Sequence, residues 1–118
     1  MHNPQYDTMV QEMTDEEKLK SVTVDALARD KTLIKQYEYW YLSTNKYPHT
    51  DRWEHQYVLW LKWKGRKKYI DYPMKKAWIE LYHIMKDITE MIGTHDFYVV
   101  RNGERDRSIP NYHIHFYS

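Results

Sequence analysis

The pattern of hydrophobic and polar positions divides the chain into strand-like and helix-like stretches. Residues 32–44, 55–64, 96–101 and 108–118 are rich in β-branched and ring-bearing side chains, which favour strands. The first stretch is long enough for a hairpin or a bent strand pair. The pattern therefore predicts five strands, and large apolar residues on both faces of the stretch 55–64 indicate that both of its faces are covered.

Capping signals and helical spacing predict two helices. The Thr14 hydroxyl and the Glu17 carboxylate three residues later suit a capping box, which would begin a short helix that runs to about Arg29. A longer helix is predicted over residues 73–92, with a proline in the tolerated first turn and Gly93 after its end. Its apolar residues recur at three- and four-residue steps and predict a core-facing stripe: Met74, Ala77, Trp78, Leu81, Ile84, Met85, Ile88 and Ile92.

The order of these elements predicts the fold class and the domain organisation. Helix, three strands, long helix and two strands give an α+β fold with a five-stranded, largely antiparallel sheet and two helices. A chain of 118 residues suits one domain, which we assign to residues 14–118. Residues 1–13 are polar and without periodicity, so we expect a flexible N-terminal arm.

Charge and cysteine content exclude several classes of function. The formal net charge of +1 gives no global attraction to nucleic acid or to an anionic membrane, so we expect neither as a partner. With Cys 0, disulfides, thiolate metal sites and cysteine nucleophiles are excluded. No apolar run approaches the roughly 18 residues of a membrane span, and the first residues lack a basic segment followed by an apolar one. We therefore expect a cytoplasmic protein.

The last predicted strand carries the residues best suited to catalysis or ligand binding. Side chains alternate along a strand, so Asn111, His113 and His115 are expected on one face. Imidazole acts near neutral pH as a nucleophile, a general base or a metal ligand. Taken alone, such a pair of histidines also fits a surface or an interface position.

The segment Ser108-Ile109-Pro110-Asn111-Tyr112-His113-Ile114-His115 resembles the motif of the histidine triad (HIT-like) superfamily of nucleotide hydrolases and transferases. That motif is His-x-His-x-His with hydrophobic x, and Asn111 stands in place of its first histidine. The similarity extends upstream to the stretches 39–48, 55–59 and 97–103, and covers about residues 32–118.

The resemblance implies a homodimer that binds a nucleotide or dinucleotide with its α-phosphate over the triad, without a cofactor or a metal. His113 matches the nucleophile that forms a nucleotidyl-histidine, and His115 matches the ring that contacts the phosphate. Ser108 matches the residue that hydrogen-bonds the phosphate or the leaving group. Asn45 matches a position that lines the ribose or base pocket, and His55 matches the ring that supports the first triad position.

Loop residues near the triad complete the set of candidates. Asn102 lies in the loop that resembles the one before the triad, and Arg101 and Arg107 are placed to add charge to a phosphate site, because guanidinium matches phosphate oxygens. Solvated loop charges are the alternative interpretation of these arginines. Together these residues predict a HIT-like nucleotide phosphohydrolase or phosphoramidase.

Two other functions remain open at this stage. With an asparagine at position 111, the chain can instead be a catalytically weak or inactive HIT-fold protein that binds or senses nucleotides. A local basic patch, Lys62, Lys64, Arg66, Lys67 and Lys68, would support such binding. The third possibility is a metal site formed by three of the histidines, His55, His113 and His115.

Overall fold

The protein is described here from a computed structural model, which describes residues 12–45, 53–62, 74–101 and 111–118. The predicted N-terminal arm falls almost wholly outside these ranges, as do most of the basic patch and the first residues of the last predicted strand. Within the described ranges, no helix has the length and apolar character needed to cross a membrane.

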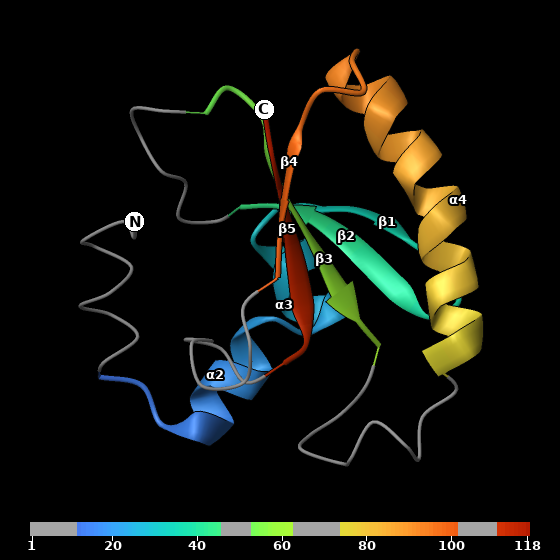
Figure 1. The fold of residues 1–118 in the computed structure, drawn as a ribbon. Helices are drawn as coiled ribbons and strands as arrows, with labels where there is room; N and C mark the ends of the chain where they lie inside the picture. The colour runs from blue at the N-terminus through green and yellow to red at the C-terminus, as the bar shows by residue number, and fades with distance from the viewer. Residues whose placement is uncertain (1–11, 46–52, 63–73, 102–110) are drawn as a thin grey trace.

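Five strands form one antiparallel sheet (Figure 1). They are β1 (Leu33–Gln36), β2 (Trp40–Thr44), β3 (Gln56–Leu61), β4 (Tyr98–Val100) and β5 (His113–Tyr117). Their order across the sheet is β1-β2-β3-β5-β4, and every neighbouring pair is antiparallel. The predicted α+β layout is confirmed, and β3 and β5 lie side by side in its centre.

The first predicted helix is two helices, α2 (Asp15–Ser21) and α3 (Val24–Arg29). The capping box is confirmed, because the Thr14 hydroxyl accepts the Glu17 N–H and the Glu17 carboxylate accepts the Thr14 N–H. A single helix to Arg29 was wrong because Thr23 adopts an extended conformation and caps a new helix, its hydroxyl accepting the N–H of Ala26.

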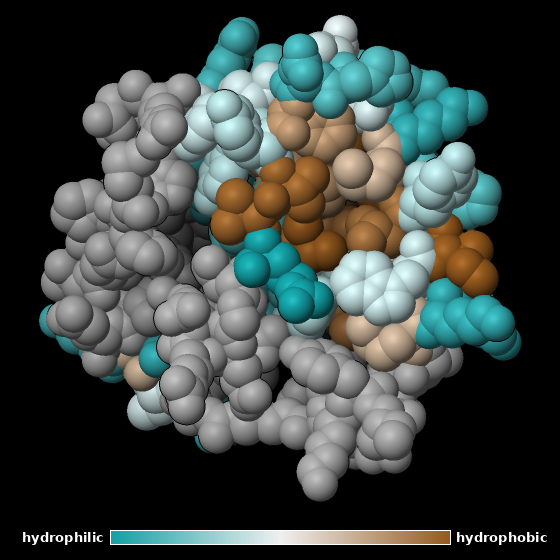
Figure 2. Space-filling view, in the orientation of Figure 1, coloured by the Kyte–Doolittle hydropathy of each residue, from teal (hydrophilic) through white to brown (hydrophobic). Residues whose placement is uncertain are grey.

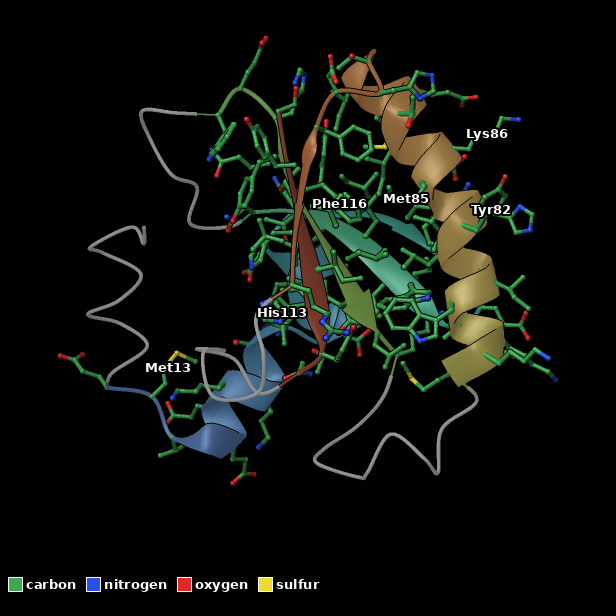
Figure 3. The ribbon with its side chains drawn as sticks, in the orientation of Figure 1. Met13, Tyr82, Met85, Lys86, His113 and Phe116 are labelled. Carbon is green, nitrogen blue, oxygen red and sulfur yellow. The ribbon has the colours of Figure 1, made fainter. Side chains whose placement is uncertain are left out.

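The long helix α4 (Met74–Ile92) agrees with the predicted helix, but Trp78 of the predicted core-facing stripe is 38% exposed. The helix ends before Gly93, whose φ of 86° is readily adopted by a residue without a side chain and whose N–H donates to the Thr89 carbonyl at 2.8 Å. Its buried face packs on the sheet, where Phe116 is fully buried. Figure 3 shows Phe116 and Met85 between the sheet and α4, with Tyr82 on the outer side of the helix.

Polar contacts join α4 to the hairpin of β1 and β2. The Trp40 indole donates to the carbonyl of Ala77 at 2.8 Å, inside the core. The Glu80 carboxylate accepts the backbone N–H groups of Glu38 and Tyr39 at 3.1 and 2.8 Å. These bonds fix the position of the helix along the sheet, because apolar packing alone is not directional.

The opposite face of the sheet carries a second, smaller core. Val22 and Leu27, from the segment of α2 and α3, pack against Tyr41, Val58 and Trp60 on β2 and β3. The Tyr41 hydroxyl donates to the carbonyl of Val22 at 2.6 Å, which ties the end of α2 to the sheet. In Figure 1, α2 and α3 lie on one side of the sheet and α4 on the other.

Candidate active site

The two histidines of β5 lie on the sheet face opposite α4. In the register of β3 and β5, His113 is directly opposite Trp60 and His115 is opposite Val58. Directly opposed residues share a face, and Trp60 and Val58 belong to the core beside α3. Figure 3 shows His113 on the side of the sheet away from α4. The ring centroids of His113 and His115 are 4.9 Å apart with an interplanar angle of 81°.

A short hydrogen bond fixes the protonation pattern of the His113 ring. Its Nδ1 lies 2.7 Å from the backbone oxygen of Asn111. A carbonyl oxygen accepts but does not donate, so Nδ1 carries the proton. In the neutral ring, the lone pair is therefore on Nε2, the nitrogen that can attack an electrophile.

The main chain of Asn111, rather than its side chain, provides this acceptor. The bond therefore does not depend on which side chain stands at position 111. The Asn111 side chain is half-buried, and its Oδ1 is buried without a hydrogen-bond partner within the residues that the structure describes. A ligand that donates a hydrogen bond to this oxygen would remove the cost of leaving a buried acceptor unpaired.

Trp60 packs against the His113 ring, and Ser43 holds the Trp60 indole in place. The centroids of the Trp60 and His113 rings are 4.6 Å apart, and the Trp60 indole donates to the Ser43 hydroxyl at 3.0 Å. Both Trp60 and Ser43 are buried. The sequence prediction did not include either residue in the site. The pairing of β3 with β5 is the signal that identifies Trp60, since the pairing places it opposite His113.

His55 lies at the wrong end of the sheet to support Asn111. Its backbone exchanges two hydrogen bonds with Ser118, at 2.9 and 3.0 Å, whereas Asn111 precedes the other end of β5. The two ends are separated by about 20 Å of strand. The expected support was wrong because antiparallel pairing brings the start of β3 to the end of β5. A role for His55 in substrate binding stays a prediction.

Asn45 shares a sheet face with the histidines. It follows β2, its N–H donates to the Gln56 carbonyl at 3.1 Å, and it is half-buried. Ser43 lies opposite Val58, so alternation places Asn45 on the same face two positions further along. Its predicted role in lining a ribose or base pocket agrees with this placement and stays a prediction.

The structure does not bring Arg101 to the histidines. Its Nη1 lies 2.9 Å from the Tyr112 hydroxyl, and its guanidinium carbon lies 5.6 Å from the centroid of that ring. Tyr112 belongs to the core beneath α4, on the opposite face of the sheet. The remaining loop candidates, Ser108, Asn102 and Arg107, lie outside the described residues, and their roles stay predictions.

The described residues do not assemble the alternative metal site. Among them there is no group of three or more His, Cys, Asp and Glu side chains that could hold a metal ion. The three-histidine arrangement fails because His55 lies at the Ser118 end of β5.

A groove of about 330 Å³ lies elsewhere, between β1 and α4. Its lining residues are Ile34, Lys35, Tyr37, Asp87, Glu90 and Met91. The hydroxyl of Tyr37 and the ammonium of Lys35 bind Asp87 at 2.8 and 3.3 Å, and the Tyr37 hydroxyl is the larger cause of the lowered pKa of that carboxyl. Two carboxylates make this groove a poor phosphate site.

Comparison with protein-family models finds no match, and comparison with the curated proteins finds none. A search of solved structures finds similarity to the crystal structure of Plasmodium falciparum diadenosine triphosphate hydrolase in complex with Cyclomarin A. The TM-score is 0.56 at 17% sequence identity, over 74% of this chain and 60% of that chain. This chain therefore has a fold like that of this hydrolase, and the match spans 60% of the hydrolase's length.

Proposed function

We propose that the protein is a nucleotide hydrolase or nucleotidyl transferase that acts at an α-phosphate through His113. The observation that carries this proposal is the 2.7 Å bond between His113 Nδ1 and the Asn111 carbonyl, which leaves the Nε2 lone pair for attack. The similar fold of an enzyme named as a diadenosine triphosphate hydrolase supports the same class of chemistry.

The reaction proceeds in two displacements. In the first, Nε2 of His113 attacks the α-phosphorus, an N–P bond forms, and the bond to the leaving group breaks with its electron pair on the leaving group. The ring is then a cation, and its Nδ1–H still donates to the Asn111 carbonyl, which stabilises the positive charge. In the second, water attacks phosphorus and gives up one proton to the solvent, the N–P bond breaks with its electron pair on Nε2, and nucleoside monophosphate leaves neutral His113 behind.

We propose that His115 contacts the phosphate that His113 attacks. The centroid of its ring lies 4.9 Å from that of His113 at an interplanar angle of 81°, close enough for His115 to contact an oxygen of the phosphate whose phosphorus His113 attacks. Phosphoryl transfer depends on donors that stabilise the equatorial oxygens. We propose His115 and Ser108 for this role, with Asn45 toward the ribose or base. The proposed enzyme works as a cytoplasmic homodimer without a metal.

A nucleotide-binding protein without turnover is the second candidate. The observation in its favour is the side chain at position 111, where an amide replaces a titratable imidazole. In this case the α-phosphate binds over the histidines, but no N–P bond forms.

Product analysis separates the two candidates. Wild type and His113→Ala are incubated with adenosine and guanosine phosphoramidates and diadenosine polyphosphates, and products are identified by mass spectrometry. The enzyme proposal expects nucleoside monophosphate from wild type and none from His113→Ala. Undiminished nucleotide binding without product from either protein rejects the enzyme proposal for these substrates and supports the binding protein.

A further inference from the structure

A continuous series of aromatic rings runs from the histidines to the edge of the sheet. The Tyr117 ring stacks on His115, with centroids 5.5 Å apart and an interplanar angle of 6°. Trp53 stacks on Tyr117 at 5.6 Å and 20°, and Tyr98 contacts Trp53 at 5.0 Å and 56°. Each ring from His113 to Tyr98 therefore contacts the next ring of the series.

The outer rings of this series lie outside both hydrophobic cores. Neither Trp53 nor Tyr98 belongs to the core clusters that the described residues form. Tyr98 is 62% exposed, and Trp53 is half-buried. Tyr98 lies on β4, an edge strand, where Val99 is also exposed. Figure 2 shows hydrophobic residues in the middle of the viewed side of the molecule, where β4 forms the edge of the sheet.

The strand register places the exposed ring beside the candidate phosphate site. Tyr98 is directly opposite Tyr117, and Val100 is opposite His115, so Tyr98 shares the face of His115. It lies about 7 Å along the strand and about 5 Å across the sheet from His115. Burial raises the pKa of the Tyr117 hydroxyl, which keeps the ring between them neutral. An aromatic ring of a ligand whose phosphate sits over the histidines is within reach of Tyr98.

We propose that Trp53 and Tyr98 form a stacking subsite for a nucleobase of the substrate. Stacking on an aromatic side chain suits any base, because every base has a π-face. This subsite rests on the proposed function only in placing the phosphate over His113 and His115. The base belongs either to the nucleotide that His113 attacks or to the leaving group. The two cases differ in which ligands lose affinity when the aromatic ring is removed.

Equilibrium binding tests the subsite without relying on turnover. The probes are adenosine monophosphate, a methylene-bridged diadenosine triphosphate analogue and inorganic tripolyphosphate, each measured by isothermal titration calorimetry. Tyr98→Ala is expected to weaken binding of a base-bearing probe about 5- to 150-fold and to leave tripolyphosphate unchanged. Trp53→Leu should act in the same direction, and Tyr98→Phe, which keeps the ring, should change affinity less than about 2-fold.

Tyr82→Ala is the matched control, because Tyr82 is 78% exposed on the outer side of α4. It should change no affinity, and circular dichroism should show that every variant is folded. If Tyr98→Ala loses affinity for both adenosine monophosphate and the dinucleotide analogue, the base belongs to the attacked nucleotide. If it loses affinity for the dinucleotide analogue alone, the base belongs to the leaving group. Unchanged affinities in Tyr98→Ala and Trp53→Leu overturn the subsite.

The binding results also separate this proposal from the catalytic one. Ring-dependent binding together with product formation that His113→Ala does not impair rejects the proposed function and keeps the subsite. Loss of turnover in His113→Ala together with ring-independent binding keeps the function and rejects the subsite. If no nucleotide binds wild type, both proposals are wrong.

Discussion

Replacement of Trp60 by phenylalanine tests how the sheet holds the His113 ring. The Trp60 side chain is 6% exposed, and its Nε1 donates to the hydroxyl of Ser43, which is 1% exposed. The variant leaves that hydroxyl without the indole donor, and an unsatisfied buried hydroxyl costs about 1–3 kcal/mol. Loss of ring contacts adds about 1 kcal/mol. We expect the free energy of unfolding to fall by about 2–4 kcal/mol.

A double-mutant cycle isolates the hydrogen bond from the packing. Ser43→Ala alone strands the buried indole N–H and should cost about 1–3 kcal/mol. The double variant Trp60→Phe/Ser43→Ala removes both polar partners, so its cost should fall short of the sum of the single variants by about 1 kcal/mol. Urea unfolding followed by far-ultraviolet circular dichroism gives all four free energies. Additivity within about 0.4 kcal/mol would refute the bond as a source of stability.

Substitutions at three further positions test other parts of the structure. Phe116→Ala should lower the free energy of unfolding by about 3–5 kcal/mol, because its ring is fully buried beneath α4; a loss under about 1 kcal/mol in urea unfolding would contradict that packing. Gly93→Ala should cost about 1 kcal/mol by thermal unfolding from strain at φ 86° alone, since nothing lies within 4 Å of an added Cβ, and Gly93→Asn should cost less. The pKa of Asp87 is lowered, first by the hydrogen bond from the Tyr37 hydroxyl and then by Lys35. The ionised carboxylate therefore stabilises the fold above its unfolded pKa of about 4, and this stability is lost as the pH falls through the lower folded pKa. In Asp87→Asn the melting temperature should therefore depend less on pH below about 4 than in wild type. The same pH dependence in both proteins would argue against the contact.

Local patterns in the sequence were enough to predict most of the fold. The alternation in 55–64, the stripe on 74–92 and the capping box at Thr14 each act within a few residues, and the structure has the corresponding β3, α4 and α2. The end of α2 was missed, because the second helix begins so soon after the first that the sequence pattern of the two looks like that of one helix. Thr23 accepts the N–H of Ala26, so a local hydrogen bond competes with continuation of the helix.

The candidate site was less predictable, because it depends on pairing between distant strands. Alternation along one strand placed His113 and His115 on the same face. It does not say which residue of β3 lies opposite, and the register brings Trp60 there and takes His55 to the far end. The direction of the Arg101 side chain likewise depends on tertiary contacts, since its partner Tyr112 is 11 residues away in the sequence.

The central claim is that His113 Nε2 forms a covalent bond to phosphorus. The most direct measurement is the mass of the protein after rapid mixing with a diadenosine polyphosphate and an alkaline quench, which preserves an acid-labile N–P bond. We predict an added nucleoside monophosphate that peptide mapping assigns to His113 and that His113→Ala lacks. Product formation at the wild-type rate by His113→Ala, or an adduct on another residue, would contradict the account.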